Sequence, residues 1–394
     1  MEKQIRRNGK SQAGVRSRRE ITAVSGRKER PMGKNSGKAL ADKYGDFLYP
    51  EAKVFAAGRK VPESDARRLE SVEVNASVGK EPDMAVLVYR VDKLPAKNQT
   101  ALEGYLEVGQ RMEVRAGYDG QDGRIFLGYL HQVEVCDLMQ GFLEYTLICL
   151  DVKGLMKKNS VFRVSGAGKL QQIRDDILEE SGYQFLMEKK SVSPLPENLN
   201  QACVVRGETH YDWLCNLAEY VNYEFFCGMG EVVFRKAGEG NGESVELSPE
   251  YGLQAVQRVV SMTGQTGSVS VWGYNRKDEK LTGTAQWRGE GGVFAGKLGQ
   301  ALKSFSLKLW DMELETGEQA SALAQAVMSR SKAACCRLEA VTIGFPELQP
   351  GCNAEIVNEK AACLSGTVYV EEVCHRLDWQ GYRTVIRGRC DEND

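Results

Sequence analysis

Apolar and polar residues alternate along much of the chain, and a period of two is typical of β-strands with one buried face. Between residues 39 and 157 the alternation recurs at 50–55, 68–77, 85–91, 114–118, 124–132 and 141–150. Asp119-Gly120 and Asp122-Gly123 mark tight turns between these runs. Short strands joined by such turns predict a small antiparallel barrel or sandwich, and we adopt the barrel for residues 39–157.

Residues 158–243 follow a different pattern, in which apolar residues recur at spacings of three and four. We expect a helix that ends at Ser181-Gly182, where glycine would adopt the left-handed cap, and then a strand at 183–185. The stretch 237–243 is rich in glycine and is expected to be a flexible joint. We therefore interpret residues 158–243 as an α/β insert between two β regions.

A helix followed by a hairpin is predicted inside this insert. Thr209 is a suitable N-cap because its hydroxyl can accept a bond from a first-turn amide, and Asp212 occupies the capping-box position. The aromatic run 223–226, a turn at Gly230 and the run 232–234 predict the hairpin. The apolar face of the helix is expected to consist of Trp213, Leu214, Leu217, Ala218 and Val221.

The alternation returns between residues 244 and 394. Strands are expected from Leu253 onward and at 271–274, 337–345, 354–357, 366–376 and 381–389. The glycine-rich stretch 282–299 predicts a mobile loop, and the alanine-rich stretch 318–332 predicts a helix. The predicted fold class is thus β-rich α+β: two small antiparallel β-barrel domains, at 39–157 and 244–394, flank the α/β insert.

Residues 1–38 carry twelve basic and three acidic residues and show no hydrophobic period. Such a composition predicts a basic N-terminal tail that is disordered when alone. Three roles are open for it: a nucleic-acid-binding arm, an arm that orders on an acidic protein neighbour, or a solvated extension.

The amino-acid composition excludes several classes of protein. The 394 residues have a net charge of −2, so the chain as a whole has no electrostatic attraction to nucleic acid or anionic lipid. No apolar run reaches the roughly 20 residues of a membrane-spanning helix, and no secretory signal is recognisable, so we expect folding and assembly in the cytoplasm. The eleven cysteines include no C-x-x-C pair, which predicts reduced, mostly buried thiols.

The motifs of catalytic and metal sites are incomplete. Residues 165–170 resemble a phosphate-binding loop, but Arg163 stands where glycine is required and Leu170 where Ser or Thr is required. A zinc site formed by Cys352, Cys363 and Cys374 with His375 is disfavoured, because the close ligand pairs are missing and Cys374 and His375 face opposite sides of a strand. We predict no enzyme activity, no cofactor and no metal.

The segment 209–236 resembles a recurrent segment of phage late control D proteins and of the VgrG-type hubs of contractile injection systems. The matching positions are Thr209, Asp212, Trp213, Leu214, Leu217, Ala218, Tyr223, Phe225, Gly230 and Phe234. Residues 108–114 and 125–130 are similar to the first-barrel pattern of that family. Residues 348–390 are similar to its closing pattern, at Pro350, Gly351, Gly366, Tyr369, His375, Gly381, Tyr382 and Thr384.

This resemblance implies a non-enzymatic structural hub of a baseplate. Such a hub is a homotrimer whose doubled barrels present a ring that adapts a sixfold tail tube to a threefold spike. The implied partners are a separate spike protein, because no needle domain follows residue 390, a tail tube or tube-initiator protein, and other baseplate proteins. Two alternatives are a tail-associated cell-wall hydrolase and a nucleic-acid-binding protein that acts through its basic arm.

Overall fold

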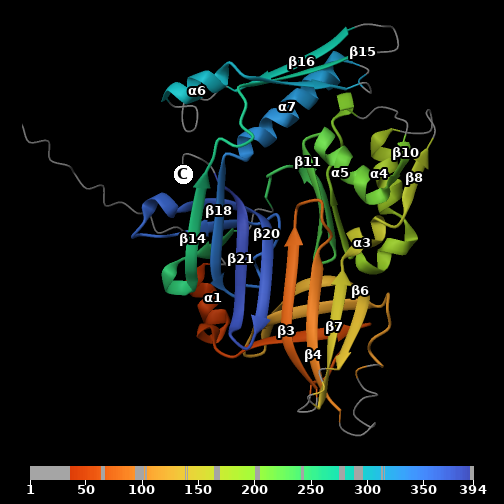
Figure 1. Cartoon of the computed structure of the whole chain (residues 1–394), viewed down its shortest axis with the longest axis vertical. Helices are drawn as coiled ribbons and strands as arrows, with labels where there is room; N and C mark the ends of the chain where they lie inside the picture. The colour runs from red at the N-terminus through yellow and green to blue at the C-terminus, as the bar shows by residue number, and fades with distance from the viewer. Residues whose placement is uncertain are drawn as a thin grey trace, which may run out of the picture.

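A computed structural model describes most of the chain between Ser36 and Cys390 (Figure 1). The described residues are 36–63, 67–93, 102, 104–137, 139, 141–163, 169–199, 205–240, 244–274, 280–287, 296–311, 314 and 316–390. Most of the predicted basic tail therefore lies outside them. Its last residues, 36–38, form the N-cap and the start of helix α1 (Gly37–Lys43).

The first β region contains every strand that the alternation predicts. These are β1 (Pro50–Ala56), β2 (Arg59–Lys60), β3 (Arg67–Ser77), β4 (Met84–Asp92), β5 (Arg111–Tyr118), β6 (Gln121–Asp137) and β7 (Phe142–Leu150). Buried positions recur at every second residue in most of β4 and β7, as a half-buried antiparallel strand requires.

Helix α3 (Val152–Met156) follows β7 at the end of the first β region. The insert then begins with β8 (Ser160–Arg163), α4 (Leu170–Leu178), β9 (Lys189–Val192) and β10 (Val205–Thr209). It continues through α5 (His210–Tyr220) into the hairpin of β11 (Tyr223–Gly228) and β12 (Glu231–Lys236). The predicted strand at 183–185 is wrong: Ser181–Leu186 is a 3-10 helix, which turns Tyr183 and Leu186, three residues apart, into the same core. Gly182 does not have the expected left-handed conformation.

The last part of the chain contains β13 (Ser244–Leu247), β14 (Leu253–Val260), β15 (Ser268–Tyr274), β16 (Lys280–Gln286), α6 (Gly296–Lys303), β17 (Ser306–Trp310), α7 (Gly317–Ala333), β18 (Cys336–Ile343), β19 (Asn353–Ile356), β20 (Gly366–Asp378) and β21 (Gly381–Cys390). The predicted helix at 318–332 is confirmed as α7, which begins with a capping box of Thr316 and Gln319.

The predicted loop at 282–299 is wrong where the structure describes it, because β16 and α6 occupy nine of the ten described residues in that range. Gly283 serves close packing. A Cβ on Gly283 would lie 2.1 Å from the backbone of Ala320, so β16 can approach α7 only because Gly283 has no side chain. The strands β16, β15 and β17 form a small sheet against α7 at the top of Figure 1.

The two β regions form one sheet of 13 strands, in the order β14-β18-β21-β20-β3-β4-β7-β6-β5-β1-β2, with β13 and β19 attached beside β20. The β-rich class is confirmed, but the path of the described strands is open, and they include no closed barrel. The physical reason is the antiparallel pairing of β3 with β20, from Ser77–Glu372 to Val72–Leu377. This pairing uses strand edges that two separately closed barrels would have to pair within themselves.

The buried apolar residues among those described form three separate cores. The largest apolar core contains Val72 and Leu87 from the first β region together with Val373 and Ile386 from the last. A second core fills the insert, and a third lies between α7 and the small sheet. None of the described helices has the length and apolar character needed to span a bilayer.

Candidate functional site

The helix–hairpin unit of residues 207–236 has the local structure that its sequence predicts. Thr209 is the N-cap of α5, and its Oγ1 accepts a hydrogen bond of 3.0 Å from the Asp212 backbone N–H. The Thr209 hydroxyl in turn donates to the Asp212 carboxylate at 2.6 Å. The apolar signature residues of α5 are all buried in the core of the insert: Trp213, Leu214, Leu217 and Ala218.

The hairpin is held by aromatic contacts and by its turn. Phe225 lies opposite Phe234, with ring centroids 6.4 Å apart, and Tyr223 lies 5.6 Å from Phe234. Gly230 has a φ of +85°, and a Cβ there would lie 2.6 Å from Leu127 on β6. The turn therefore needs glycine both for its conformation and for its close approach to the large sheet.

A buried polar junction connects the hairpin with the last β region. Arg235 on β12 donates through Nε to Glu224 on β11 at 2.8 Å, and through Nη2 to the Gly351 carbonyl at 2.8 Å and to the Tyr369 hydroxyl at 3.3 Å. Burial and the Glu224 carboxylate raise the pKa of Tyr369, so its hydroxyl stays protonated and donates to Glu224. Arg389 lies over the Tyr369 ring and completes the junction.

The junction brings together residues that are far apart in the sequence. Gly351 and Tyr369 were predicted as signature positions, whereas Glu224 and Arg235 were missed. The missed pair left a signal in the sequence, because the register of the predicted hairpin places the opposite charges of Glu224 and Arg235 directly across from each other. Gly351 has a φ of +81°, and a Cβ on it would lie 2.5 Å from Phe226, so a side chain there would separate the two parts.

A second polar cluster lies around His375, which is buried in the large core. Its Nε2 lies 3.1 Å from the Leu348 carbonyl, which can only accept, so Nε2 carries the proton. Its Nδ1 is then an acceptor, and the Tyr382 and Thr384 hydroxyl oxygens each lie 3.0 Å from it. Burial lowers the pKa of His375 to about 4. The signature residues His375, Tyr382 and Thr384 thus form one neutral structural cluster.

The remaining signature positions have backbone roles. Gly366 begins β20 and Gly381 begins β21, with φ values of +146° and +108°. Pro350 lines a small hollow between the insert and the large sheet. They contribute no group for acid–base chemistry.

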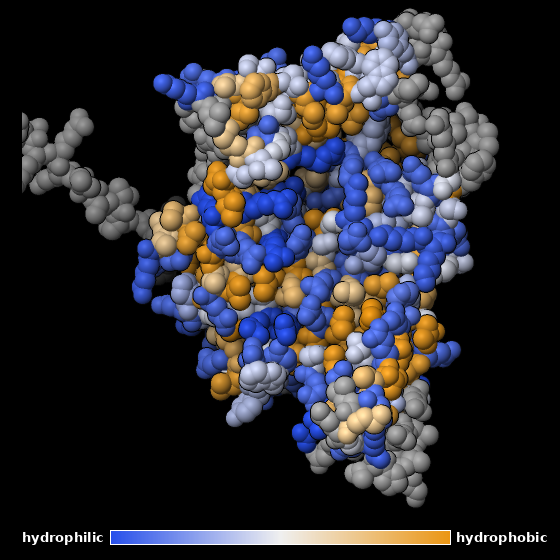
Figure 2. All heavy atoms as spheres, in the orientation of Figure 1, coloured by the Kyte–Doolittle hydropathy of each residue, from blue (hydrophilic) through white to orange (hydrophobic). Residues whose placement is uncertain are grey.

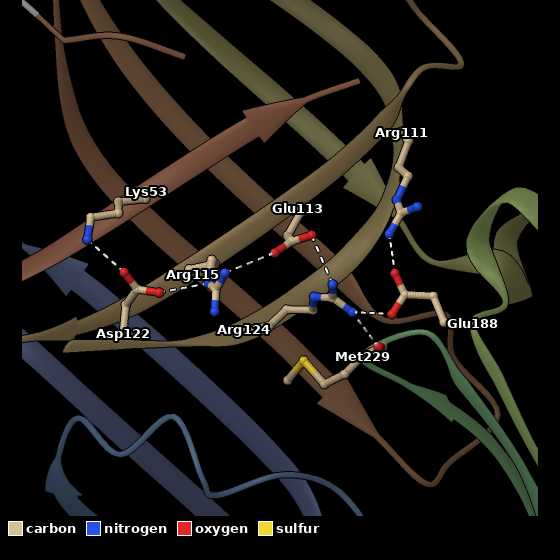
Figure 3. A network of polar contacts seen from close by, with 8 residues as sticks. All are labelled: Lys53, Arg111, Glu113, Arg115, Asp122, Arg124, Glu188 and Met229. Carbon is tan, nitrogen blue, oxygen red and sulfur yellow. Dashed lines mark hydrogen bonds and ion pairs between the residues drawn. The ribbon is translucent and has the colours of Figure 1, made fainter. Parts of the chain in front are cut away.

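A chain of ion pairs crosses the face formed by β1, β5 and β6 (Figure 3). Lys53 Nζ lies 2.6 Å from Asp122, and Arg115 Nε lies 2.7 Å from the other oxygen of the same carboxylate. Glu113 follows, 3.9 Å from Arg115 and 3.1 Å from Arg124. Each carboxylate lies between two cations, so none of these charges depends on a single partner.

The ion-pair chain continues into the insert. Arg124 Nη1 lies 2.6 Å from Glu188 and also donates to the Met229 carbonyl at 3.1 Å, and Arg111 pairs with the same Glu188 carboxylate. Hydrogen bonding from Arg124 is the main cause that lowers the pKa of Glu188. The sheet therefore contacts the insert through a charged network at the hairpin turn, in addition to the buried junction at its other end.

A buried ion pair lies beside this contact. Lys153 on α3 is fully buried, and its Nζ lies 2.7 Å from Asp83 and 3.7 Å from Asp151. Burial raises the pKa of Asp151 well above its usual range, and Lys153 opposes that effect. Both carboxyl groups line the small hollow together with Cys227. With one amine facing two carboxyl groups, the site ties α3 to β4 and β7.

These contacts brace the insert against the large sheet. Among the described residues, no three His, Cys, Asp or Glu side chains gather in a way that could hold a metal ion. The buried groups around Glu224 and His375 hydrogen-bond to one another. At Lys153 the amine donates to Asp83, whereas the buried Asp151 carboxyl oxygens have no hydrogen-bond partner among the described residues.

One family model matches most of the chain. The family model described as the Alg8 N-terminal domain matches residues 49–378. The chain belongs to this family. The match covers the first β region, the insert and most of the last β region.

Solved structures of tail proteins share the fold. A tail protein from Neisseria meningitidis has a TM-score of 0.64 at 12% identity, over 87% of this chain and 97% of its own. The 43 kDa tail protein of prophage MuSo2 from Shewanella oneidensis has a TM-score of 0.63 at 15% identity, over 86% and 98%. An E. coli component of the type VI secretion system has a TM-score of 0.55 at 10% identity, over 86% and 77%.

At these identities the likeness establishes a common fold. The E. coli protein is itself described as structurally similar to tail proteins of bacteriophage T4. No curated protein matches the chain.

Proposed function

We propose that this protein is a structural component of the baseplate hub in a contractile phage tail or a tail-like injection particle. The observation that carries the proposal is the shared fold over nearly the whole length of two tail proteins, with 97% and 98% of their chains covered. The residues that resemble late control D and VgrG-type hubs support it, because they lie at the hairpin, at the buried junction and in the His375 cluster.

The proposed work of the protein is mechanical and non-enzymatic. Three copies form a ring, in which the modules 39–157 and 244–394 act as paired β units that adapt a sixfold tube to a threefold spike. The insert, 158–243, braces both units, and its contacts fit this role. The Arg124–Glu188 pair holds one end of the hairpin on β6, and Arg235 holds the other end on Gly351 and Tyr369.

The outer edge of β14 is the part of the surface that we assign to the contact between copies. Among the described strands β14 ends the sheet path, so one of its edges has no strand partner in the described chain. Val259 and Val260 at its end are 47% and 51% exposed. Figure 2 shows apolar residues among the polar ones over this part of the surface, at the left of the view. A strand edge with exposed valines is a suitable surface for a second copy.

The further proposed partners are a separate spike protein, a tail tube or tube-initiator protein, and other baseplate proteins. We place assembly in the bacterial cytoplasm and the finished protein in the baseplate of a tail or tail-like particle. In this arrangement the protein positions its neighbours and leaves cell-wall cleavage to other components.

The mass of the protein in solution tests the proposed trimeric hub. Light scattering of the purified full chain alone, over a range of concentrations, is expected to give three times the chain mass. A candidate spike protein that binds should add its own mass to that value. Electron microscopy is expected to show threefold rings. Val260→Asp should shift the mass towards the monomer because it places a charge at the proposed contact. Val135→Asp, at a similarly exposed valine on β6 away from that edge, should leave the mass unchanged.

A strict monomer under all these conditions would contradict the hub. Release of peptidoglycan fragments by the purified protein, abolished by single carboxylate substitutions, would instead establish a hydrolase.

A further inference from the structure

Two cysteines face each other at one end of the large sheet. Cys336 is the first residue of β18 and Cys390 is the last residue of β21. The two strands are antiparallel neighbours in which Arg337 lies opposite Arg389, so the next position along places Cys336 opposite Cys390. Their sulfur atoms lie 2.6 Å apart, although 54 positions separate them in the chain.

This separation is close to that of a covalent bond. A disulfide has an S–S distance of about 2.05 Å and needs Cβ atoms about 3.5–4.5 Å apart. Directly opposite residues on antiparallel strands hold their Cβ atoms about 4.5–5.5 Å apart, so only a small movement of the strands is needed. The pair therefore meets the geometric requirement before any oxidation takes place.

The two thiols differ in access and in their charged neighbours. Cys336 is fully buried, and Arg258 Nε on the neighbouring strand β14 lies 3.2 Å from its sulfur. Cys390 is half-buried, so a small oxidant reaches it first. Burial is the main cause that raises the pKa of the Cys390 thiol to about 12, which makes its first reaction slow at neutral pH.

We propose that Cys336 and Cys390 form an oxidative modification site, in which a low-molecular-weight disulfide such as oxidised glutathione converts the two thiols into a cross-strand disulfide. In the first step the Cys390 thiolate attacks one sulfur of the oxidant and releases one glutathione thiolate, leaving a mixed disulfide. The Cys336 thiolate then attacks Cys390 Sγ and expels the second glutathione thiolate. The protein loses two protons and two electrons, and the oxidant becomes two thiols.

The bond would tie the end of β21 to the start of β18. It closes a loop of 54 positions, which restricts the unfolded chain, so the oxidised protein should unfold at a temperature higher by about 2–5 °C. This proposal concerns the thiols alone and does not depend on the hub function.

The experiment treats the folded, full chain with oxidised glutathione, blocks the remaining thiols by alkylation, and maps peptides by mass spectrometry without reduction. The variant Cys136→Ser/Cys363→Ser serves as the parent protein, because both of those cysteines are exposed and would react directly. We expect a linked peptide pair that contains Cys336 and Cys390, a mass lower by two hydrogen atoms, and faster formation at pH 8.5 than at pH 7.

Further variants separate the two steps. Cys336→Ser should accumulate the glutathione adduct on Cys390 and form no link. Cys335→Ser, at the adjacent residue, should form the link as the parent does. Recovery of both Cys336 and Cys390 as alkylated thiols after prolonged treatment would overturn the proposal, and so would a link through Cys335.

Discussion

Glu224 connects three segments of the chain that meet at the buried junction. Its carboxylate lies on β11 and is contacted by Arg235 from β12, by the Tyr369 hydroxyl from β20 and by the Gly238 N–H after the hairpin. Removing it would leave Arg235 buried with fewer acceptors, and an uncompensated buried charge is costly. Glu224 is therefore central to the buried junction, while the Arg124–Glu188 pair connects insert and sheet at the hairpin turn.

Glu224→Ala is expected to lower the free energy of unfolding by about 3–5 kcal/mol, measured by urea denaturation. Glu339→Ala is the matched control, because Glu339 pairs with Arg387 at 2.7 Å but both side chains are well exposed. That pair should contribute no more than about 1 kcal/mol. Equal losses in the two variants would show that the junction is not a buried structural link.

His375 makes the free energy of unfolding depend on pH. Its burial determines whether stability rises or falls as the pH changes. Burial lowers its pKa to about 4, whereas the unfolded chain has the ordinary value of about 6.5. Below pH 6.5 the unfolded state therefore binds a proton that the folded state does not. The contribution of this residue is fully present above pH 6.5 and is lost as the pH falls towards 4.

This loss should amount to about 3 kcal/mol between pH 6.5 and 4. Thermal unfolding of wild type and His375→Gln across this window measures it, and the variant should show a shallower decline. His131→Gln, at a partly exposed histidine, should keep the wild-type slope. A variant slope identical to that of wild type would rule out His375 as the source.

At the scale of elements, α5 and its hairpin behave as one packing unit. The helix lies across the aromatic strands, with Trp213 only 6% exposed. Its C-terminal end is also held, because Arg330 on α7 donates to the Glu219 carbonyl at 2.6 Å. The unit therefore joins the insert core to the helix that supports the small sheet.

Trp213→Ala is expected to cost about 3–5 kcal/mol, because it leaves a large cavity in the insert core. Thr209→Ala should cost only about 1 kcal/mol, because it removes the cap while the apolar face stays in place. Chemical denaturation measures both variants. A Trp213→Ala protein as stable as Thr209→Ala would mean that the helix is not anchored by its aromatic residue.

At the scale of the whole molecule, the segment just before β1 and both β regions meet in one aromatic cluster. Phe345, which precedes β19, lies 5.3 Å from Phe47, and Phe47 lies 5.5 Å from Tyr118 on β5. Tyr44 and Tyr382 each pack against Tyr118 as well. Together with the β3–β20 pairing, this cluster makes the stability of the two β regions interdependent.

Phe345→Ala is expected to destabilise both regions together, by about 3–5 kcal/mol. Native-state hydrogen exchange should show reduced protection in β4 and β5 as well as in β18 and β21. Reduced protection confined to the last third of the chain would show that the two β regions unfold independently.

The amino-acid sequence by itself determined most of the helices and strands. The alternation in the β regions, the Thr209 cap, the hairpin at Gly230 and the alanine-rich helix all depend on neighbours within a few residues, so their signals lie in short stretches of the chain. The strand predicted at 183–185 and the loop predicted at 282–299 were wrong because distant contacts decided them. Tyr183 packs into the insert core, and Gly283 packs against α7.

Only the tertiary structure decided how the parts are joined. No local pattern shows that β3 pairs with β20, that Glu224 and Arg235 bind Tyr369 and Gly351, or that Cys336 faces Cys390. These contacts bring together residues that lie 54 to about 300 positions apart in the chain. Their partners are chosen by the packing of whole sheets, which brings distant residues together only when the chain has folded.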